Sequence, residues 1–104
     1  MLFVFERGFE MPVIIPPKVG RVVLFVPKSS NHENGFCINA GADHSARIAY
    51  VHVGETYVNV EAIDANGKTF NRIRVPLVQD GYAAPDEDYC HWMDYQVEQA
   101  KKSQ

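Results

Sequence analysis

Residues 57–78 have the sequence YVNVEAIDANGKTFNRIRVPLV, in which two alternating runs of apolar residues flank an Asn-Gly pair. In the first run Val58, Val60 and Ala62 share one face, and a period of two is typical of a half-buried strand. Asn66-Gly67 accepts the positive φ angles of a tight hairpin turn. The stretch therefore predicts a β-hairpin whose return strand covers 70–78.

The return strand also predicts a surface. On a regular strand Phe70, Arg72 and Arg74 share one face, opposite Ile73 and Val75. Lys68 lies at the adjoining turn and Arg47 in a neighbouring predicted strand. An aromatic ring with guanidinium groups can stack on a base and bind phosphate, which makes these residues a candidate nucleotide-binding face. The alternative is the ordinary solvent-exposed face of a half-buried strand.

Further strands are predicted around this hairpin. β-branched and aromatic runs indicate strands over 21–26, 46–53 and 89–93, with a short one at 36–38 inside the polar loop 28–45. Asp94 is a suitable N-cap for a helix through residue 102. Strands this short need closure to protect their edges. The sequence therefore predicts a mainly β fold, a small SH3-like antiparallel barrel of about five strands with a short C-terminal helix. An open sheet packed on the helix is the alternative.

Length and charge restrict the classes of function. The chain has 104 residues, which is enough for one domain. A net charge of -3 argues against broad nucleic-acid binding, which needs a basic surface, but leaves room for a local basic patch. No apolar run approaches the roughly 20 residues that span a bilayer, so we expect no membrane association. We expect Cys37 and Cys90 to stay reduced, because two cysteines make no disulfide framework.

The first residues allow two interpretations. Met11-Pro12 is a plausible second start, which would make residues 1–10 a translated leader and 11–104 a single barrel domain. Alternatively, Phe3, Phe5 and Phe9 form an edge strand or an anchor.

No pattern of catalytic or metal-binding residues emerges. The available zinc ligands show no C-x₂-C or H-x₃-H spacing, so we predict neither a metal site nor another cofactor. Cys90 and His91 are adjacent, and neighbours on a strand point to opposite faces, so they form no catalytic dyad. Motifs for a serine nucleophile or a phosphate loop do not occur, and we predict a protein that is not an enzyme. The zinc-ligand candidates considered are His32, Cys37, His44, Cys90 and His91.

Two groups of residues are candidates for contact with a partner. His32, Glu33 and Asn34 lie in the long polar loop, and a loop of that length is either functional or mobile. Trp92 and Tyr95 could anchor a partner protein. The alternative is that these aromatic residues, together with Tyr89, close the core beneath the terminal helix.

Two sequence blocks, VPLVQ at 75–79 and WMDYQ at 92–96, resemble a group of small tailed-bacteriophage proteins that have no assigned activity. The likeness covers roughly residues 20–100, and the group has proline at the position of Asp94. A looser likeness to SH3-like barrels of the chromatin-reader type concerns the fold alone.

The resemblance implies a phage source, and hence the host bacterial cytoplasm or the virion. The expected function is that of an accessory protein that binds a host or phage protein. The alternatives are a minor virion protein that forms a symmetric homo-oligomer, and a binder that sequesters a nucleotide signal.

Overall fold

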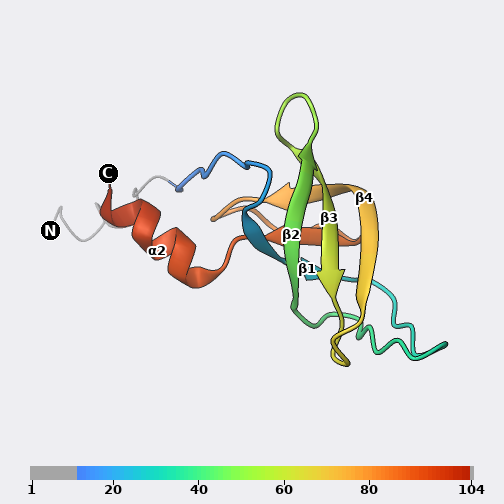
Figure 1. The fold of residues 1–104 in the computed structure, drawn as a ribbon. Helices are drawn as coiled ribbons and strands as arrows, with labels where there is room; N and C mark the ends of the chain where they lie inside the picture. The colour runs from blue at the N-terminus through green and yellow to red at the C-terminus, as the bar shows by residue number, and fades with distance from the viewer. Residues whose placement is uncertain (1–11, 104) are drawn as a thin grey trace, which may run out of the picture.

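The computed structural model describes residues 12–103, which form a closed five-stranded barrel followed by one helix (Figure 1). The predicted mainly β barrel with a C-terminal helix is therefore confirmed. The second start at Met11 and the edge strand through Phe3, Phe5 and Phe9 lie outside the described residues. The elements are β1 (Val22–Val26), β2 (His44–Val51), β3 (Tyr57–Ile63), β4 (Thr69–Val78), β5 (Tyr89–His91) and α2 (Asp94–Lys102).

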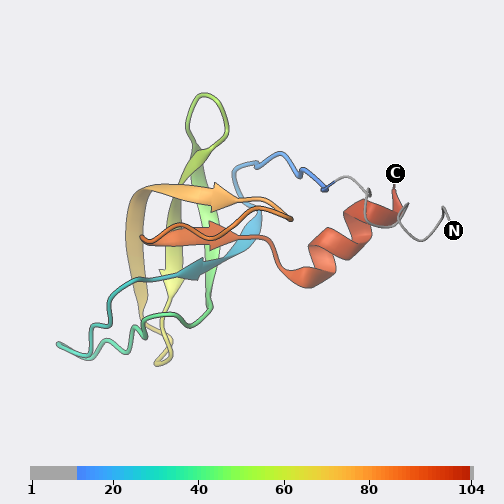
Figure 2. The same ribbon diagram turned by 180° about the vertical axis from the view of Figure 1, so that it is seen from behind.

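Successive strands β1 to β4 pair antiparallel, and β5 closes the barrel between β1 and β4. The last strand is antiparallel to β1 but parallel to β4, which departs from the expected antiparallel barrel. The reason is the connection 79–88, which runs back along the last part of β4 before β5 begins, as the orange loop in Figure 2 shows. Parallel neighbours need such a crossover connection.

Strand boundaries follow the pairing partners. The predicted hairpin is confirmed, with β3 and β4 on either side of the Asn66-Gly67 pair, although only Gly67 has a positive φ, of 81°. The strand predicted over 46–53 begins and ends two residues earlier, because its first residue, His44, pairs with Phe25 of β1. His52 and Val53 consequently belong to the β2–β3 turn. The segment 36–38 forms no strand, and Ile38 makes a single bridge with Asn31.

A β-bulge in β4 reverses the faces predicted for the return strand. The register runs from Val58↔Val75 to Val60↔Arg72, which is two residues along β3 and three along β4. The extra residue turns the side chains over. Phe70 is 7% exposed and Val75 4%, so both are in the core, whereas Ile73 is 76% exposed. The prediction that Phe70 faces away from the core was therefore wrong.

The barrel interior holds one hydrophobic core. Phe25 meets Phe70 edge to face, with ring centres 5.8 Å apart, a favourable arrangement for two aromatic rings. Trp92 covers the end of the core nearest the helix. The buried core residues are Val13, Ile15, Val23, Phe25, Ile38, Ala46, Ile48, Val58, Val60, Ala62, Phe70, Val75, Leu77, Cys90 and Trp92.

Helix α2 starts after Met93, so Asp94 is its first residue and not the predicted N-cap. The side chain of Gln96 does the capping: its Oε1 accepts the Met93 N–H at 2.8 Å, and its Nε2 donates to the Val22 carbonyl at 2.9 Å. The second contact ties the helix to β1, although Figures 1 and 2 both show α2 projecting away from the barrel. Within residues 12–103 no helix is long and apolar enough to cross a bilayer.

Candidate functional site

Asn59 of β3 lies between two irregularities of the sheet and contacts residues on both sides of its strand. The β4 bulge lies on one side, and a second register shift, between Ile48 and Tyr50 of β2, lies on the other. Asn59 Oδ1 accepts the Arg74 N–H at 2.7 Å and contacts His52 Nε2 at 2.8 Å. Arg74 has a φ of 54°, a backbone conformation that residues other than glycine rarely adopt. The amide oxygen of Asn59 thus satisfies the backbone donor at the strained position.

Aromatic and basic side chains surround Asn59. The Tyr50 ring meets the His52 ring edge on, with centres 5.0 Å apart, and Tyr50 is 51% exposed. The Arg74 guanidinium lies 4.5 Å from the centre of the Tyr57 ring, within the range of a cation–π contact. We call this surface, together with the exposed Ile73 beside it, the bulge face. Its residues are Tyr50, His52, Tyr57, Asn59, Ile73 and Arg74.

Tyrosine and arginine are enriched among the residues that anchor protein–protein interfaces. Sequence reasoning missed this group because it assumed regular alternation along 70–78. A polar Asn59 among Val58, Val60 and Ala62 was the available signal, although by itself it also fits an ordinary solvent-facing position.

The five residues predicted to bind a nucleotide do not form one face. Phe70 is buried and its ring is not available for stacking on a base. The Arg72 guanidinium lies 5.0 Å from the centre of that ring and 4.0 Å from Asp88. Arg47 pairs with Glu61 at 3.0 Å, and the Lys68 ammonium lies 4.8 Å over Phe36. Arg74 lies over the Tyr57 ring, so each of the four basic side chains contacts a different partner.

The polar loop between β1 and β2 folds back on itself. Asn31 and Ile38 exchange two backbone hydrogen bonds of 2.9 Å each. At its tip Asn34 and Gly35 have φ angles of 56° and 83°, as a tight turn requires. His32, Glu33 and Asn34 are exposed there, and His32 Nε2 contacts Asn39 Oδ1 at 2.9 Å. The loop therefore has an ordered shape that presents these three residues to solvent.

Asp64 fixes this loop to the β3–β4 hairpin. Its Oδ1 accepts the N–H groups of Asn66 and Lys68 at 2.9 and 2.8 Å, and its Oδ2 accepts the Cys37 N–H at 2.8 Å. Burial alone would raise the pKa of the Asp64 carboxyl. The three N–H donors and the Lys68 charge lower it by more, so the pKa lies below its ordinary value of 3.8. The buried carboxylate is thus a structural acceptor for two loops.

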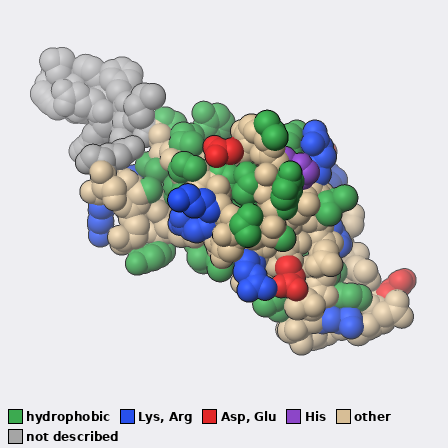
Figure 3. Space-filling model, turned by 45° about the horizontal axis from the view of Figure 1, so that its top comes forward, with side chains coloured by type: hydrophobic (Ala, Val, Ile, Leu, Met, Phe, Trp, Pro, Cys, Tyr) green, Lys and Arg blue, Asp and Glu red, His purple; other side chains and the backbone are tan. Residues whose placement is uncertain are grey.

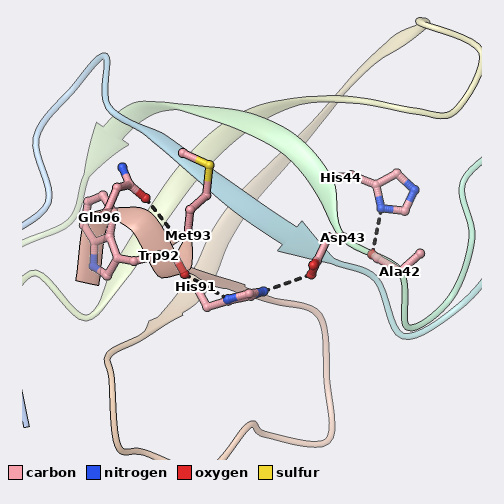
Figure 4. A network of polar contacts seen from close by, with 7 residues as sticks. All are labelled: Ala42, Asp43, His44, His91, Trp92, Met93 and Gln96. Carbon is pink, nitrogen blue, oxygen red and sulfur yellow. Dashed lines mark hydrogen bonds and ion pairs between the residues drawn. The ribbon is translucent and has the colours of Figure 1, made fainter. Parts of the chain in front are cut away.

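Two histidines near β2 also have structural contacts (Figure 4). His44 is buried; its Nδ1 lies 2.9 Å from the Ala42 carbonyl, and its Nε2 accepts the Asn39 N–H at 3.3 Å. These contacts fit the tautomer with the proton on Nδ1. His91 Nε2 contacts Asp43 Oδ1 at 2.9 Å, which links β5 to the start of β2. Both rings hold neighbouring segments together.

Neither cysteine is placed as a nucleophile. Cys90 is fully buried, and burial together with the Asp88 charge raises the pKa of its thiol to about 12. Such a thiol stays protonated at neutral pH. Cys37 Sγ lies 3.7 Å from Asn39 Nδ2, and no thiol–imidazole hydrogen bond occurs in the described part of the chain. Among the same residues, no three His, Cys, Asp or Glu side chains converge on a point where a metal could bind.

The two predicted aromatic anchors differ in exposure. Trp92 is buried, with the Arg21 guanidinium 5.2 Å from its ring centre, so it closes the core and cannot reach a partner. Tyr95 is 70% exposed on α2. The hypothesis of a Trp92–Tyr95 anchor therefore keeps only Tyr95.

An open groove of ≈ 510 Å³ adjoins the bulge face and shares Tyr57 with it. One wall is formed by Ile14, Pro16 and Pro17, from a segment that Gln79 holds: Gln79 Oε1 accepts the Ile15 N–H and Gln79 Nε2 donates to the Ile15 carbonyl, both at 2.9 Å. The β2–β3 turn, the end of β4 and the 79–88 connection form the other walls. Figure 3 brings the end of the molecule with this turn forward, and hydrophobic side chains gather there among scattered charges.

No family model, curated protein or solved structure matches this chain. The resemblance to tailed-phage proteins therefore stays a prediction.

Proposed function

We propose that this chain is a non-enzymatic binding protein that recognises another protein through the bulge face. The observation that carries the proposal is the exposure of Ile73, 76%, on strands whose backbone Asn59 fixes beside Tyr50 and Arg74. A single exposed apolar residue is common on protein surfaces. An exposed isoleucine next to exposed tyrosine and arginine matches the composition of interface centres.

The rigidity of the bulge face favours binding. Fixing an interface before binding reduces the entropy lost on association. Here Asn59 holds the Arg74 backbone, and Tyr57 orients the Arg74 guanidinium. A protein partner fits better than nucleic acid, because the net charge is -3 and the nearby Arg47 is neutralised by Glu61.

The biological setting is part of the same proposal. It is that of a phage accessory protein whose partner is a host or phage protein, in the host cytoplasm or in the virion. The support is the resemblance of the blocks at 75–79 and 92–96.

Ile73→Glu tests the proposal. We expect the variant to lose at least about tenfold in partner affinity, because a carboxylate replaces an apolar side chain at the interface centre. Stability should change little, since Ile73 contributes nothing to the core. The measurement is affinity capture from phage-infected host lysate with quantitative mass spectrometry, followed by titration of the captured protein.

The matched control is Val19→Glu, which places the same charge at another exposed aliphatic residue, outside the bulge face. Proteins retained by wild type and by the control but lost with Ile73→Glu support the proposal. Equal capture by all three proteins removes it.

The exposed apolar surface also favours a second candidate, a symmetric oligomer in which the bulge face meets a second copy. Native mass spectrometry separates the two candidates, because only the oligomer would show an Ile73-dependent homo-assembly without a partner. Mass spectrometry of purified virions tests whether the assembly is part of the particle.

A further inference from the structure

The charged side chains that line the groove are both acidic. They are Glu55, from the β2–β3 turn, and Glu87, from the connection before β5. Neither forms an ion pair within residues 12–103, although four other acidic residues there pair with lysine or arginine, namely Glu61, Asp80, Asp86 and Asp88. The remaining lining is mostly apolar and aromatic. Within the described part of the chain, the groove therefore offers an apolar surface with two carboxylates that have no ion-pair partner.

Glu55 occupies a position that does not favour glutamate. Its φ is 63°, and it follows Gly54, whose φ is 95°. The left-handed conformation costs a residue with a side chain on the order of 1 kcal/mol relative to glycine. A second glycine or an asparagine would suit the turn better, so the conformation of this turn gives no reason for the carboxylate that it places at the groove.

The walls of the groove limit how an occupant can be recognised. Pro16, Pro17, Pro76 and Pro85 all line it, and proline has no backbone N–H. An occupant therefore cannot add itself as a strand through a continuous ladder of backbone hydrogen bonds. Recognition must rest on side chains: apolar contact with the walls, and attraction of a cation to the carboxylates and to the exposed ring of Tyr82.

We propose that the groove binds an extended segment of the partner protein in which a lysine or arginine lies next to apolar residues. The inference rests on the proposed function and specifies the partner's chemistry. Because Tyr57 belongs to both surfaces, one partner can cover the bulge face and extend into the groove.

The test is selection of random linear peptides displayed on a surface, followed by titration of the selected peptides against three proteins. These are wild type, Glu55→Lys/Glu87→Lys, and a control, Asp94→Lys/Glu98→Lys, whose exposed carboxylates on α2 lie outside the groove. Both double variants change the net charge equally. We expect wild type to select peptides with Lys or Arg beside apolar residues. These peptides should bind the groove variant at least about tenfold more weakly and the control within about twofold of wild type.

Three results would overturn the inference: no peptide enriched, enriched peptides without basic residues, or equal losses in both double variants. Results that reject the groove inference can be distinguished from results that reject the proposed function. A captured partner that depends on Ile73 but binds the groove variant normally removes the groove inference alone. If peptides bind the groove but partner capture does not depend on Ile73, only the proposed role of the bulge face is rejected.

Discussion

Replacing Asp64 with alanine is expected to lower the melting temperature by on the order of 10 °C, because three backbone N–H groups lose their acceptor. Those groups belong to Cys37, Asn66 and Lys68, so the change loosens the hairpin turn and the polar loop together. Buried donors without acceptors are among the costliest local defects. Thermal denaturation followed by circular dichroism measures the effect.

Asp64→Asn separates charge from hydrogen bonding. The amide oxygen can still accept from the hairpin, but the amide nitrogen cannot accept the Cys37 N–H. The folded-state pKa of Asp64 is the lower one, so its carboxylate stabilises the fold fully above about pH 4. That stabilisation is lost as the pH falls through the folded-state pKa. The stability difference between wild type and Asp64→Asn should therefore narrow in acid, and a constant difference would contradict this role.

Phe70→Ala is expected to lower the free energy of unfolding by about 4 kcal/mol, a large share of the total for a domain of this size. The ring is buried against Phe25, and its loss leaves a cavity in the barrel centre. Urea denaturation gives the value.

The counterpart of Phe70→Ala is Ile73→Thr, which keeps a β-branched side chain. It should change the free energy of unfolding by less than about 0.5 kcal/mol. Regular alternation along β4 predicts the reverse: a small loss of stability on substitution of Phe70 and a large loss on substitution of Ile73. A small loss at Phe70 with a large loss at Ile73 would therefore refute the bulge.

The strands and the closed barrel could be predicted because alternation and the Asn66-Gly67 turn are local signals. The face assignment along 70–78 failed because one extra residue in β4 inverts all positions beyond it. The signal for that residue is the contact of Asn59 with Arg74, 15 positions apart. Such a contact exists only after the strands pair, so periodicity within one strand cannot reveal it.

The candidate surface was predictable in part for the same reason. Arg74 was expected to face solvent, and it does, but its companions are Tyr50, His52 and Tyr57, which come from β2, the β2–β3 turn and β3. The sequence allowed two roles for Trp92, a core residue or an anchor for a partner. Which role applies depends on whether the end of the barrel needs a side chain to close it. The glutamines that end the two phage-like blocks, Gln79 and Gln96, both satisfy backbone groups of distant segments, which gives them a structural role.

The β4 bulge is the basis of the proposed binding surface, and cross-strand NOEs between backbone protons in isotopically labelled protein test it directly. The bulge predicts contacts of Val58 with Val75 and of Val60 with Arg72. A contact of Val60 with Ile73 would show regular pairing without a bulge. Ile73 would then face the core, and the surface proposed to bind the partner would not exist.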